Sequence, residues 1–597
     1  MTQKILAGRT DDGRLAGDLV RVKVDQVVLA RQPRLVVADG VALGMKKTAV
    51  ETAVVYETHC VTSGATPARG PSEWTELMRE APGILLARPG IGFPAPVHLE
   101  RFASPGRLAL TDEPRLASTG GAGMLTLTVS PAQLASALTQ GHVLVRPPRT
   151  VQVLLSGKPR PFVCVRDVAL ELVRRQLAEI IQRIDETEQA PVVLEFAGPS
   201  ARLLSVPDRA VLASLAPQLG ATAALFVSDE KTEVYLRDQR RSKAHRALVP
   251  DAGAPCEDVI SVDLSAVDPL LKDQRGVVRP VRELADQPVA QVFLGGDAGA
   301  SLRDLLAAAA LLKSKRVPPG LDLLFAPPSR QTLEVLGQSG ALVDLIATGA
   351  RLVEPDQRLV AGDLYPPPAD GLSLRTFDPE PNMPNDRRFV VASAETLAFA
   401  VATGKVGDPR GFKRPVRVAA PRVLPTEDAL LLRKGKGRPR QEASPTEGLS
   451  SVARAQPWTN GTTLQIISKP GPAELTGPSA VIIESLEQLR WVAHRAADLC
   501  PHLRAVIATH IPRGTVPVFA GLGILALGVD ESSLAKLRGE PMLGLPPPER
   551  WNGEGITGSA GGSEVKLRWL AVGAERNWTT EGTAALPRAA RPSEAIS

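Results

Sequence analysis

The chain has 597 residues, enough for three or four domains of ordinary size. Hydrophobic residues make up 44% and charged residues 22% of it, as in a folded globular protein, which excludes wholesale disorder. The four cysteines, Cys60, Cys164, Cys256 and Cys500, lie far apart without a CxxC pair, which argues against a disulfide framework or a zinc site and favours buried thiols in a reducing compartment.

The N-terminal segment carries charged side chains at once and has no apolar stretch of the secretory type, so we expect no export. Among the longest uninterrupted apolar runs is 305–312, far short of the roughly 18 residues that cross a bilayer. We therefore expect a cytoplasmic protein without a membrane partner. His59 precedes Cys60, but adjacent side chains on an extended strand point to opposite faces, so the pair does not predict a nucleophile with its base.

Short β-branched runs alternate with longer amphipathic ones, which predicts an α/β fold. The clearest series starts with a strand at 289–294, a Gly-rich turn, Ser301 as N-cap and a helix over 302–315. A second strand at 321–326 and a helix from about 329 to 339 follow. Such a βαβα series favours a parallel sheet covered by helices.

From about 411 to 457 prolines recur and the apolar periodicity fades, which is typical of a linker. Between residues 405 and 440 eleven Lys or Arg stand against three Asp or Glu, a net charge of +8, whereas the whole chain carries only +6. The basic character of the protein is therefore a property of this segment. A compact domain resumes after it, with strands predicted at 463–467, 480–483 and 505–508.

Short motifs along nearly the whole chain occur in an order typical of one enzyme family. They lie at 4–7, 17–25, 155–168, 195–199, 219–230, 503–508 and 521–527, and the most specific of them is Gln-Val-Phe-Leu-Gly-Gly-Asp-Ala-Gly-Ala-Ser-Leu-Arg-Asp-Leu at 291–305. Together they resemble the aconitase and isopropylmalate dehydratase family, with large subunit and swivel domain in one chain.

The resemblance implies an aconitase-like α/β fold, with three α/β domains around a cleft and a C-terminal swivel domain. On this basis we expect domains 1 and 2 in residues 1–285, domain 3 in 286–410, the basic linker in 411–457 and the swivel domain in 458–597.

The resemblance also implies three cysteines that hold a [4Fe-4S] cluster. The matching positions carry Asp297, Gln357 and Val360 instead. Iron–sulfur clusters depend on soft thiolate ligands, so the sequence predicts that the cluster is absent and that the protein holds no metal and no other cofactor.

Other functional positions of the family differ as well. Arg375 matches a substrate-binding arginine, while a second arginine is replaced by Glu380, which reverses a charge where a substrate carboxylate binds. An Asp-Ser-His element appears as Glu113-Pro114-Arg115. His59 and Ser485 are the nearest remnants of catalytic residues. Because these groups support the same transition state, their joint loss argues against retained dehydratase chemistry.

Three hypotheses for the function follow. The first is a pseudoenzyme that acts as a binding or regulatory protein, with a small polycarboxylate or an unknown protein as partner. The second is a divergent hydro-lyase acting on a di- or tricarboxylate.

Two sequence features have both a structural and a functional interpretation. The turn at 295–301 is either a tight turn or an anion site at a helix N-terminus, and Arg375 is either a structural ion-pairing residue or a substrate clamp.

The third hypothesis is DNA or RNA binding through residues 405–440. Lys434, Lys436, Arg438 and Arg440 surround glycines and a proline in a pattern similar to an AT-hook, whose arginines follow a narrow minor groove. A solvated basic linker is the alternative.

We predict that any nucleic-acid affinity resides in this linker and falls steeply with salt, because Lys and Arg neutralise phosphates. Fluorescence anisotropy with A·T-rich duplex, G·C-rich duplex and single-stranded RNA at two salt concentrations measures it. The double variant Arg438→Ala/Arg440→Ala is expected to bind more weakly, and preference for A·T-rich duplex would identify an AT-hook. Unchanged binding in the variant would place the site elsewhere, and no binding at low salt would exclude this partner.

Overall fold

The computed structural model describes residues 1–57, 83–381, 387–418, 420–426, 429–432, 456–468, 475–553 and 555–581. Two groups of predicted residues lie outside these ranges: His59, and the predicted nucleic-acid contacts Lys434, Lys436, Arg438 and Arg440. Cys60 lies outside them too. Within the described part no helix is long and apolar enough to cross a membrane.

The first α/β unit is a six-stranded sheet in the order β19-β4-β3-β2-β5-β6, parallel except for β19. Its strands are β2 (Gln26–Leu29), β3 (Thr52–Tyr56), β4 (Ile84–Ala87), β5 (Leu108–Thr111), β6 (Leu125–Thr128) and β19 (Leu431–Leu432), and its helices are α1 (Thr2–Ala7), α2 (Pro33–Ala42), α4 (Pro94–Arg101), the 3-10 helix η1 (Pro114–Ala122) and α5 (Pro131–Gln140). An antiparallel pair, β1 (Val20–Lys23) and β7 (His142–Val145), lies beside it.

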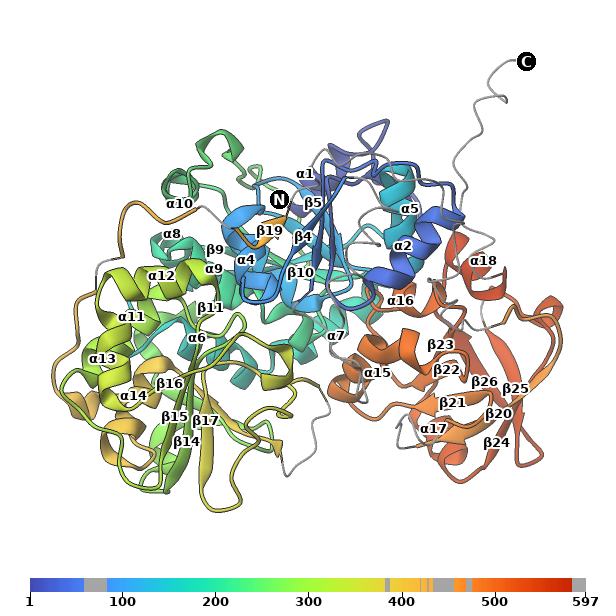
Figure 1. Cartoon of the computed structure of the whole chain (residues 1–597). Coiled ribbons are helices and arrows are strands. Elements are labelled where there is room, and N and C mark those ends of the chain that lie inside the picture. The colour runs from blue at the N-terminus through green and yellow to red at the C-terminus, as the bar shows by residue number, and fades with distance from the viewer. Residues whose placement is uncertain are drawn as a thin grey trace, which may run out of the picture.

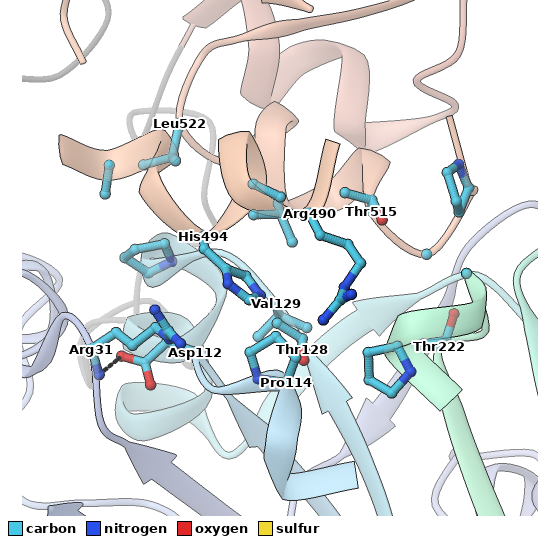
Figure 2. Close-up of a pocket in the computed structure, with 18 of the residues that line it drawn as sticks. Arg31, Asp112, Pro114, Thr128, Val129, Thr222, Arg490, His494, Thr515 and Leu522 are labelled. Carbon is cyan, nitrogen blue, oxygen red and sulfur yellow. Dashed lines mark hydrogen bonds between the residues drawn. The ribbon is translucent and has the colours of Figure 1, made fainter. Parts of the chain in front are cut away.

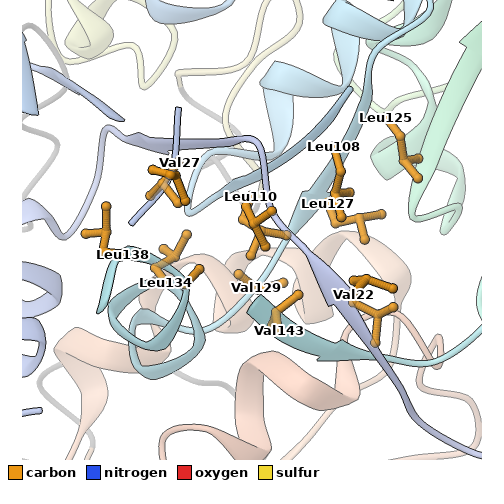
Figure 3. Packing of buried hydrophobic residues seen from close by; sticks show 14 of the residues in the cluster. Val22, Val27, Leu108, Leu110, Leu125, Leu127, Val129, Leu134, Leu138 and Val143 are labelled. Carbon is orange, nitrogen blue, oxygen red and sulfur yellow. The ribbon is translucent and has the colours of Figure 1, made fainter. Parts of the chain in front are cut away.

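Buried apolar side chains fill this unit on both faces of the sheet, as a parallel sheet requires. All four residues of β2 and of β5 are buried. Figure 3 shows Val27 and Leu110 packed against Leu134 and Leu138 of α5, with Val143 of β7 nearby. Helix α5 starts at a capping box between Ser130 and Gln133, which satisfies two otherwise orphan backbone N–H groups.

The second unit is a four-stranded parallel sheet in the order β10-β9-β8-β11. Its strands are β8 (Arg149–Ser156), β9 (Val192–Ala197), β10 (Ala223–Phe226) and β11 (Asp258–Asp263), and its helices are α6 (Val165–Arg174), α7 (Leu177–Glu188), α8 (Pro199–Leu203), α9 (Val206–Ala213), the 3-10 helix η2 (Ala216–Leu219) and α10 (Glu230–Asp238). Figure 1 shows this unit in the middle of the molecule.

The third unit is a seven-stranded sheet in the order β13-β12-β18-β17-β14-β15-β16. Its strands are β12 (Leu270–Lys272), β13 (Val278–Pro280), β14 (Val289–Gly295), β15 (Asp322–Ala326), β16 (Arg351–Leu352), β17 (Leu372–Arg375) and β18 (Val390–Ala392), and its helices are α11 (Leu302–Leu312), α12 (Arg330–Gln338), α13 (Ala341–Thr348) and α14 (Ala394–Thr403). The predicted βαβα series is confirmed: β14 and β15 are parallel, Ser301 caps α11 and Ser329 caps α12.

The fourth unit is a closed seven-stranded sheet, β20-β21-β22-β23-β26-β25-β24, shown in orange and red in Figure 1. Its strands are β20 (Thr462–Ile467), β21 (Ser479–Ile482), β22 (Leu503–Ala508), β23 (Leu525–Gly528), β24 (Met542–Leu545), β25 (Ile556–Ala560) and β26 (Ser563–Trp569), and its helices are α15 (Leu486–Leu499), α16 (Val516–Ala520), α17 (Glu531–Arg538) and α18 (Ala574–Glu581). The three strands predicted here match β20, β21 and β22. The mixed α/β fold class is thus confirmed.

Two boundaries differ from those predicted. The third sheet takes in β12 and β13, so it begins before the predicted limit at 285/286, because β12 pairs with β18. The predicted linker contributes a strand: Leu431 and Leu432 pair with β4, and the Arg88 amide donates to the Leu430 carbonyl over 3.0 Å. Residues 430–432 of the predicted linker are therefore part of the edge of the first sheet.

Buried ion pairs join the fourth unit to the first two. Arg146, which follows β7, donates from Nε to Glu575 Oε1 of α18 over 3.0 Å and from Nη2 to the Leu570 carbonyl over 2.7 Å. Arg513 donates its amide to Asp185 Oδ2 of α7 over 2.8 Å, and burial raises the pKa of Asp185 to about 7 despite the charge of Arg513. Each pair is almost fully buried, so removal of one partner leaves an uncompensated charge.

We therefore predict that Glu575→Ala costs about 3–5 kcal/mol of unfolding free energy, since Arg146 would lose its carboxylate in a dry interface. Glu564→Ala, an exposed glutamate on β26, serves as the control and is expected to stay within about 0.5 kcal/mol. Thermal and denaturant unfolding of both variants measures the effect. Equal stability of the two variants would contradict a structural role for this pair.

Candidate functional site

A cavity of about 100 Å³ lies where the first two units meet helix α15. Its wall includes Arg31 and Asp112 from one side and Arg490 and His494 of α15 from the other, as Figure 2 shows. A smaller cavity of about 20 Å³ adjoins it and shares Pro114, Pro217, Arg490 and His494 with it. The smaller cavity is lined further by Arg115, Asp297 and Asp378, so charged side chains of three units converge on it.

The topology explains this convergence. Arg31 follows β2, Asp112 and Glu113 follow β5, Asp297 follows β14 and Asp378 follows β17. Each side chain thus leaves the carboxyl end of a strand that pairs in parallel with its neighbours. In open α/β sheets this is the edge where ligands bind.

Asp112 fixes the loop that carries Arg31. Its carboxylate accepts hydrogen bonds from the amides of Ala30, Arg31 and Gln32 over 2.8, 3.0 and 2.7 Å. Burial raises the pKa of Asp112, although these three donors act against it. Glu113 orients the Arg31 side chain, since its Oε2 accepts from Arg31 Nε over 2.9 Å, and its Oε1 accepts from the backbone amide of Arg115 over 2.9 Å.

Glu380 is the common partner of the cleft. Its Oε1 accepts from Arg31 Nη2 over 3.0 Å and from Gln357 Nε2 over 2.6 Å. Arg115 Nη2 lies 3.9 Å from the same oxygen, and His494 Nδ1 lies 3.6 Å from Oε2. Burial opposes ionisation of Glu380, but Arg31, His494 and Arg115 outweigh it, and the pKa of Glu380 lies well below its ordinary value.

Asp378 forms a second charged centre beside the first. It accepts from Arg166 Nη1 over 2.8 Å and forms an ion pair with Lys272. Burial works against its charge, yet Arg166 and Lys272 hold the pKa of Asp378 well below its ordinary value. The Asp378 carbonyl also accepts from Arg115 Nη2 over 3.2 Å, which ties the two centres together.

Arg490 differs from the other arginines of the cleft. It projects from α15 into the cavity, as Figure 2 shows, and within the described residues no hydrogen bond or ion pair engages its guanidinium. Burial and then the charge of Arg115 lower the pKa of Arg490 to about 10, so it stays protonated at neutral pH. Burial also lowers the pKa of His494 to about 4, so this ring is neutral there. Arg490 is therefore the cation best placed to meet an anion in the cavity.

The structure brings some of the predicted site residues together. Asp297 is buried, with Oδ2 3.8 Å from Arg115 Nε, and Gln357 binds Glu380. Val360 lies in an apolar cluster, and its carbonyl accepts from the Glu380 amide over 2.9 Å. Ser485 is exposed and caps α15 by accepting from the Gln488 amide over 3.2 Å.

Arg375 lies in the core beneath the cleft. It is fully buried, donates to the Leu359 carbonyl over 2.8 Å and to the Tyr365 carbonyl over 2.6 Å, and stacks over the Phe389 ring at 4.2 Å. Burial lowers the pKa of Arg375 to about 9. These contacts explain Arg375 as a core residue. It lines neither cavity of the cleft, so its role as a substrate clamp stays a prediction.

The turn at 295–301 is tightly packed. Gly295 has φ +95°, and a Cβ on it would meet the Ala326 carbonyl oxygen at 1.9 Å, so only glycine fits. At the end of the turn Ser301 and Asp304 form a capping box, in which the Asp304 carboxylate accepts from the Ser301 amide over 3.0 Å. The helix N-terminus thus already holds a carboxylate of the chain itself.

Three largely parallel sheets around a charged cleft, together with a closed C-terminal sheet, define an aconitase-like α/β protein. The family model of the aconitase family (aconitate hydratase) matches residues 72–275. A 3-isopropylmalate dehydratase large subunit of Deinococcus radiodurans is 30% identical over 370 residues, 60% of this chain and 80% of the relative. Those of Archaeoglobus fulgidus and Thermotoga maritima are each 27% identical, over 69% and 66% of this chain and 99% and 96% of the relatives.

The chain therefore belongs to the aconitase and 3-isopropylmalate dehydratase superfamily of hydro-lyases. This corrects one prediction from the sequence. We expected no cofactor, but the dehydratases of this family normally carry a [4Fe-4S] cluster, so membership implies one.

The residues at the matching positions do not themselves fit such a cluster. Asp297 offers a carboxylate, Gln357 an amide already bound to Glu380, and Val360 no ligand atom, whereas clusters are held by thiolates. In the part of the chain that the structure describes, no group of three or more His, Cys, Asp or Glu side chains is placed to hold a metal ion. No reaction step is therefore assigned to a cluster at these positions.

We predict that Glu380→Gln lowers stability by about 3 kcal/mol at neutral pH, because Arg31 and Arg115 lose a buried counter-charge. The pKa of Glu380 is depressed in the folded state, so its contribution is present above the unfolded value near 4.5 and is lost as the pH falls through the folded value. The difference in Tm between wild type and Glu380→Gln is therefore expected to shrink below about pH 4.5.

Thermal unfolding across a pH series measures this difference. Glu334→Gln, at an exposed position of α12, is the matched control and should change the Tm little at any pH. A difference for Glu380→Gln that persists unchanged into acid would contradict the electrostatic role of this carboxylate.

Proposed function

We propose that this hydro-lyase-family protein is a pseudoenzyme of the cytoplasm that binds a small polycarboxylate instead of converting it. The observation that carries the proposal is the position of Glu380. It brings a carboxylate of the chain itself to the arginines of the cleft, at a position where the family resemblance implies an arginine for the substrate.

An external carboxylate has to compete with Glu380 for Arg31 and Arg115. Glu380 is tethered beside these arginines, so its effective concentration is far above that of a free metabolite. Exchange of an arginine for a glutamate also lowers the local charge by two. Both effects weaken the binding of a substrate in the orientation that dehydration requires.

Arg490 supports residual binding of an anion. Its guanidinium faces the cavity of about 100 Å³ and makes no direct hydrogen bond or ion pair among the described residues, although the charges of Glu380, Asp378 and Glu487 act on it from farther away. A carboxylate in the cavity could therefore bind it directly. A ligand there contacts α15 of the C-terminal unit and the loops of the first two units at once. Its binding would therefore depend on how these units are placed relative to one another, as expected of a regulatory ligand.

We predict weak binding of tricarballylate, a tricarboxylate without a double bond, that is weakened about tenfold by Arg490→Gln, since a charge-assisted hydrogen bond is lost. Glu380→Gln is expected to strengthen binding about tenfold because Arg31 and Arg115 become available. Isothermal titration calorimetry measures both, and Arg202→Gln, at an exposed position of α8, is the control.

Turnover is tested on anaerobically prepared protein, with and without iron and sulfide reconstitution, by following the ultraviolet absorbance of isopropylmaleate and cis-aconitate. No hydration above a protein-free blank is expected. Activity that scales with protein concentration and is lost in Arg490→Gln would overturn the proposal in favour of a divergent hydro-lyase. Binding of DNA or RNA through residues 405–440 stays a separate prediction.

A further inference from the structure

A second cavity lies on the opposite side of the loop that carries Asp297. It measures about 80 Å³, is partly open, and is lined by residues of α4, η1, α9, α10, the start of α12 and by residues 298 and 300–302. Ala298 lines both this cavity and the smaller cavity of the cleft, so one residue separates the two. The cavity is several times larger than the roughly 10–15 Å³ that one water molecule needs.

The lining of this cavity has a chemistry unlike that of the cleft. It contains no Lys, Arg, His or Asp, and its one carboxylate, Glu100, accepts from Ser329 Oγ over 2.7 Å. Leu99, Val211 and Leu302 contribute apolar surface. An anion finds no counter-charge here, and a small uncharged molecule with an apolar body fits.

One buried polar group in the wall has no hydrogen-bond partner among the described residues. Ser118 of η1 is 2% exposed, and within the described residues its Oγ makes no hydrogen bond. A buried hydroxyl without a partner is costly, so a native structure normally supplies one. The neighbouring amides do not: Gln239 and Gln331 bond each other over 2.7 and 2.8 Å.

Part of the predicted linker, residues 424 and 425, borders the cavity on its outer side. Leu424 lines it and is 8% exposed, while the Pro425 carbonyl accepts from Gln331 Nε2 over 2.6 Å. This segment leads to β19 at the edge of the first sheet. The cavity is thus bounded by the wall of the cleft on one side and by the linker on the other.

We propose that this cavity is a binding site for a small uncharged molecule of about five non-hydrogen atoms, with an apolar body and a carbonyl or ether oxygen that accepts from Ser118 Oγ. A molecule seated there contacts Ala298 and Ala300 and so braces the loop that holds Asp297. Ala298 has φ +51°, a conformation that non-glycine residues adopt only where the surroundings impose it. The site is separate from the anion site at Arg490.

The probes are 2-butanone, which carries an acceptor on an apolar body, and propionate, which has the same number of non-hydrogen atoms but a charge. Ligand-observed NMR titration of the full chain is expected to give saturable binding of 2-butanone in the millimolar range, without competition by propionate. Ser118→Ala should weaken it about fivefold, since one hydrogen bond is lost. Ala300→Leu, which fills the cavity, should abolish it, whereas Ser532→Ala on the exposed face of α17 should leave it unchanged.

A crystal soaked in 2-butanone tests the location without any variant. Density for the ketone oxygen beside Ser118 Oγ is expected. Ordered water alone at Ser118, or 2-butanone binding that neither variant affects, would overturn the proposal. Tricarballylate binding measured on the same samples reports on the cleft independently, so failure of one site leaves the other assessable.

Discussion

The ion pairs of Glu380 are the constraint on which the cleft depends. One carboxylate contacts Arg31 from the first unit, Gln357 from the third and His494 from the fourth. Charges taken out of water are stable only when they are paired and hydrogen-bonded. The three units must therefore keep their relative positions for Glu380 and its partners to stay paired. The same requirement applies farther out, where Arg146 meets Glu575 and Arg513 meets Asp185.

Much of the fold could be predicted from the sequence because its signals are local. The β14–α11 segment combines a β-branched apolar run, glycines at positive φ and a serine cap, and each of these acts within a few residues. Strand β19 could not be predicted, since two leucines among prolines form a strand only because β4 offers an open edge. The limit of the third sheet was missed for the same reason: β12 is defined by its pairing with β18.

The residues of the cleft, like the fold, could be predicted only in part from the sequence. The sequence marks Glu380 and Arg115 as departures from the family pattern. It does not show that Glu380 pairs with Arg31, which lies 349 positions away in the chain. Arg490 and His494 are four residues apart on α15 and so share one face of the helix, a spacing that could have drawn attention to them. Arg375 was singled out by its motif, yet the fold encloses it among phenylalanine rings.

The loop between Gly295 and Ser301 separates two environments of opposite chemistry. On one side charged groups satisfy one another around Glu380 and Asp378, and on the other side the wall is largely apolar. The loop itself has little freedom: a Cβ on Gly299 would meet the Thr376 carbonyl oxygen at 2.2 Å, and Ser301 is tied to Asp304. Ala298 lines the apolar cavity, and the Oδ2 atom of its neighbour Asp297 lies 3.8 Å from Arg115 Nε, so consecutive residues of one tightly packed loop serve the two environments.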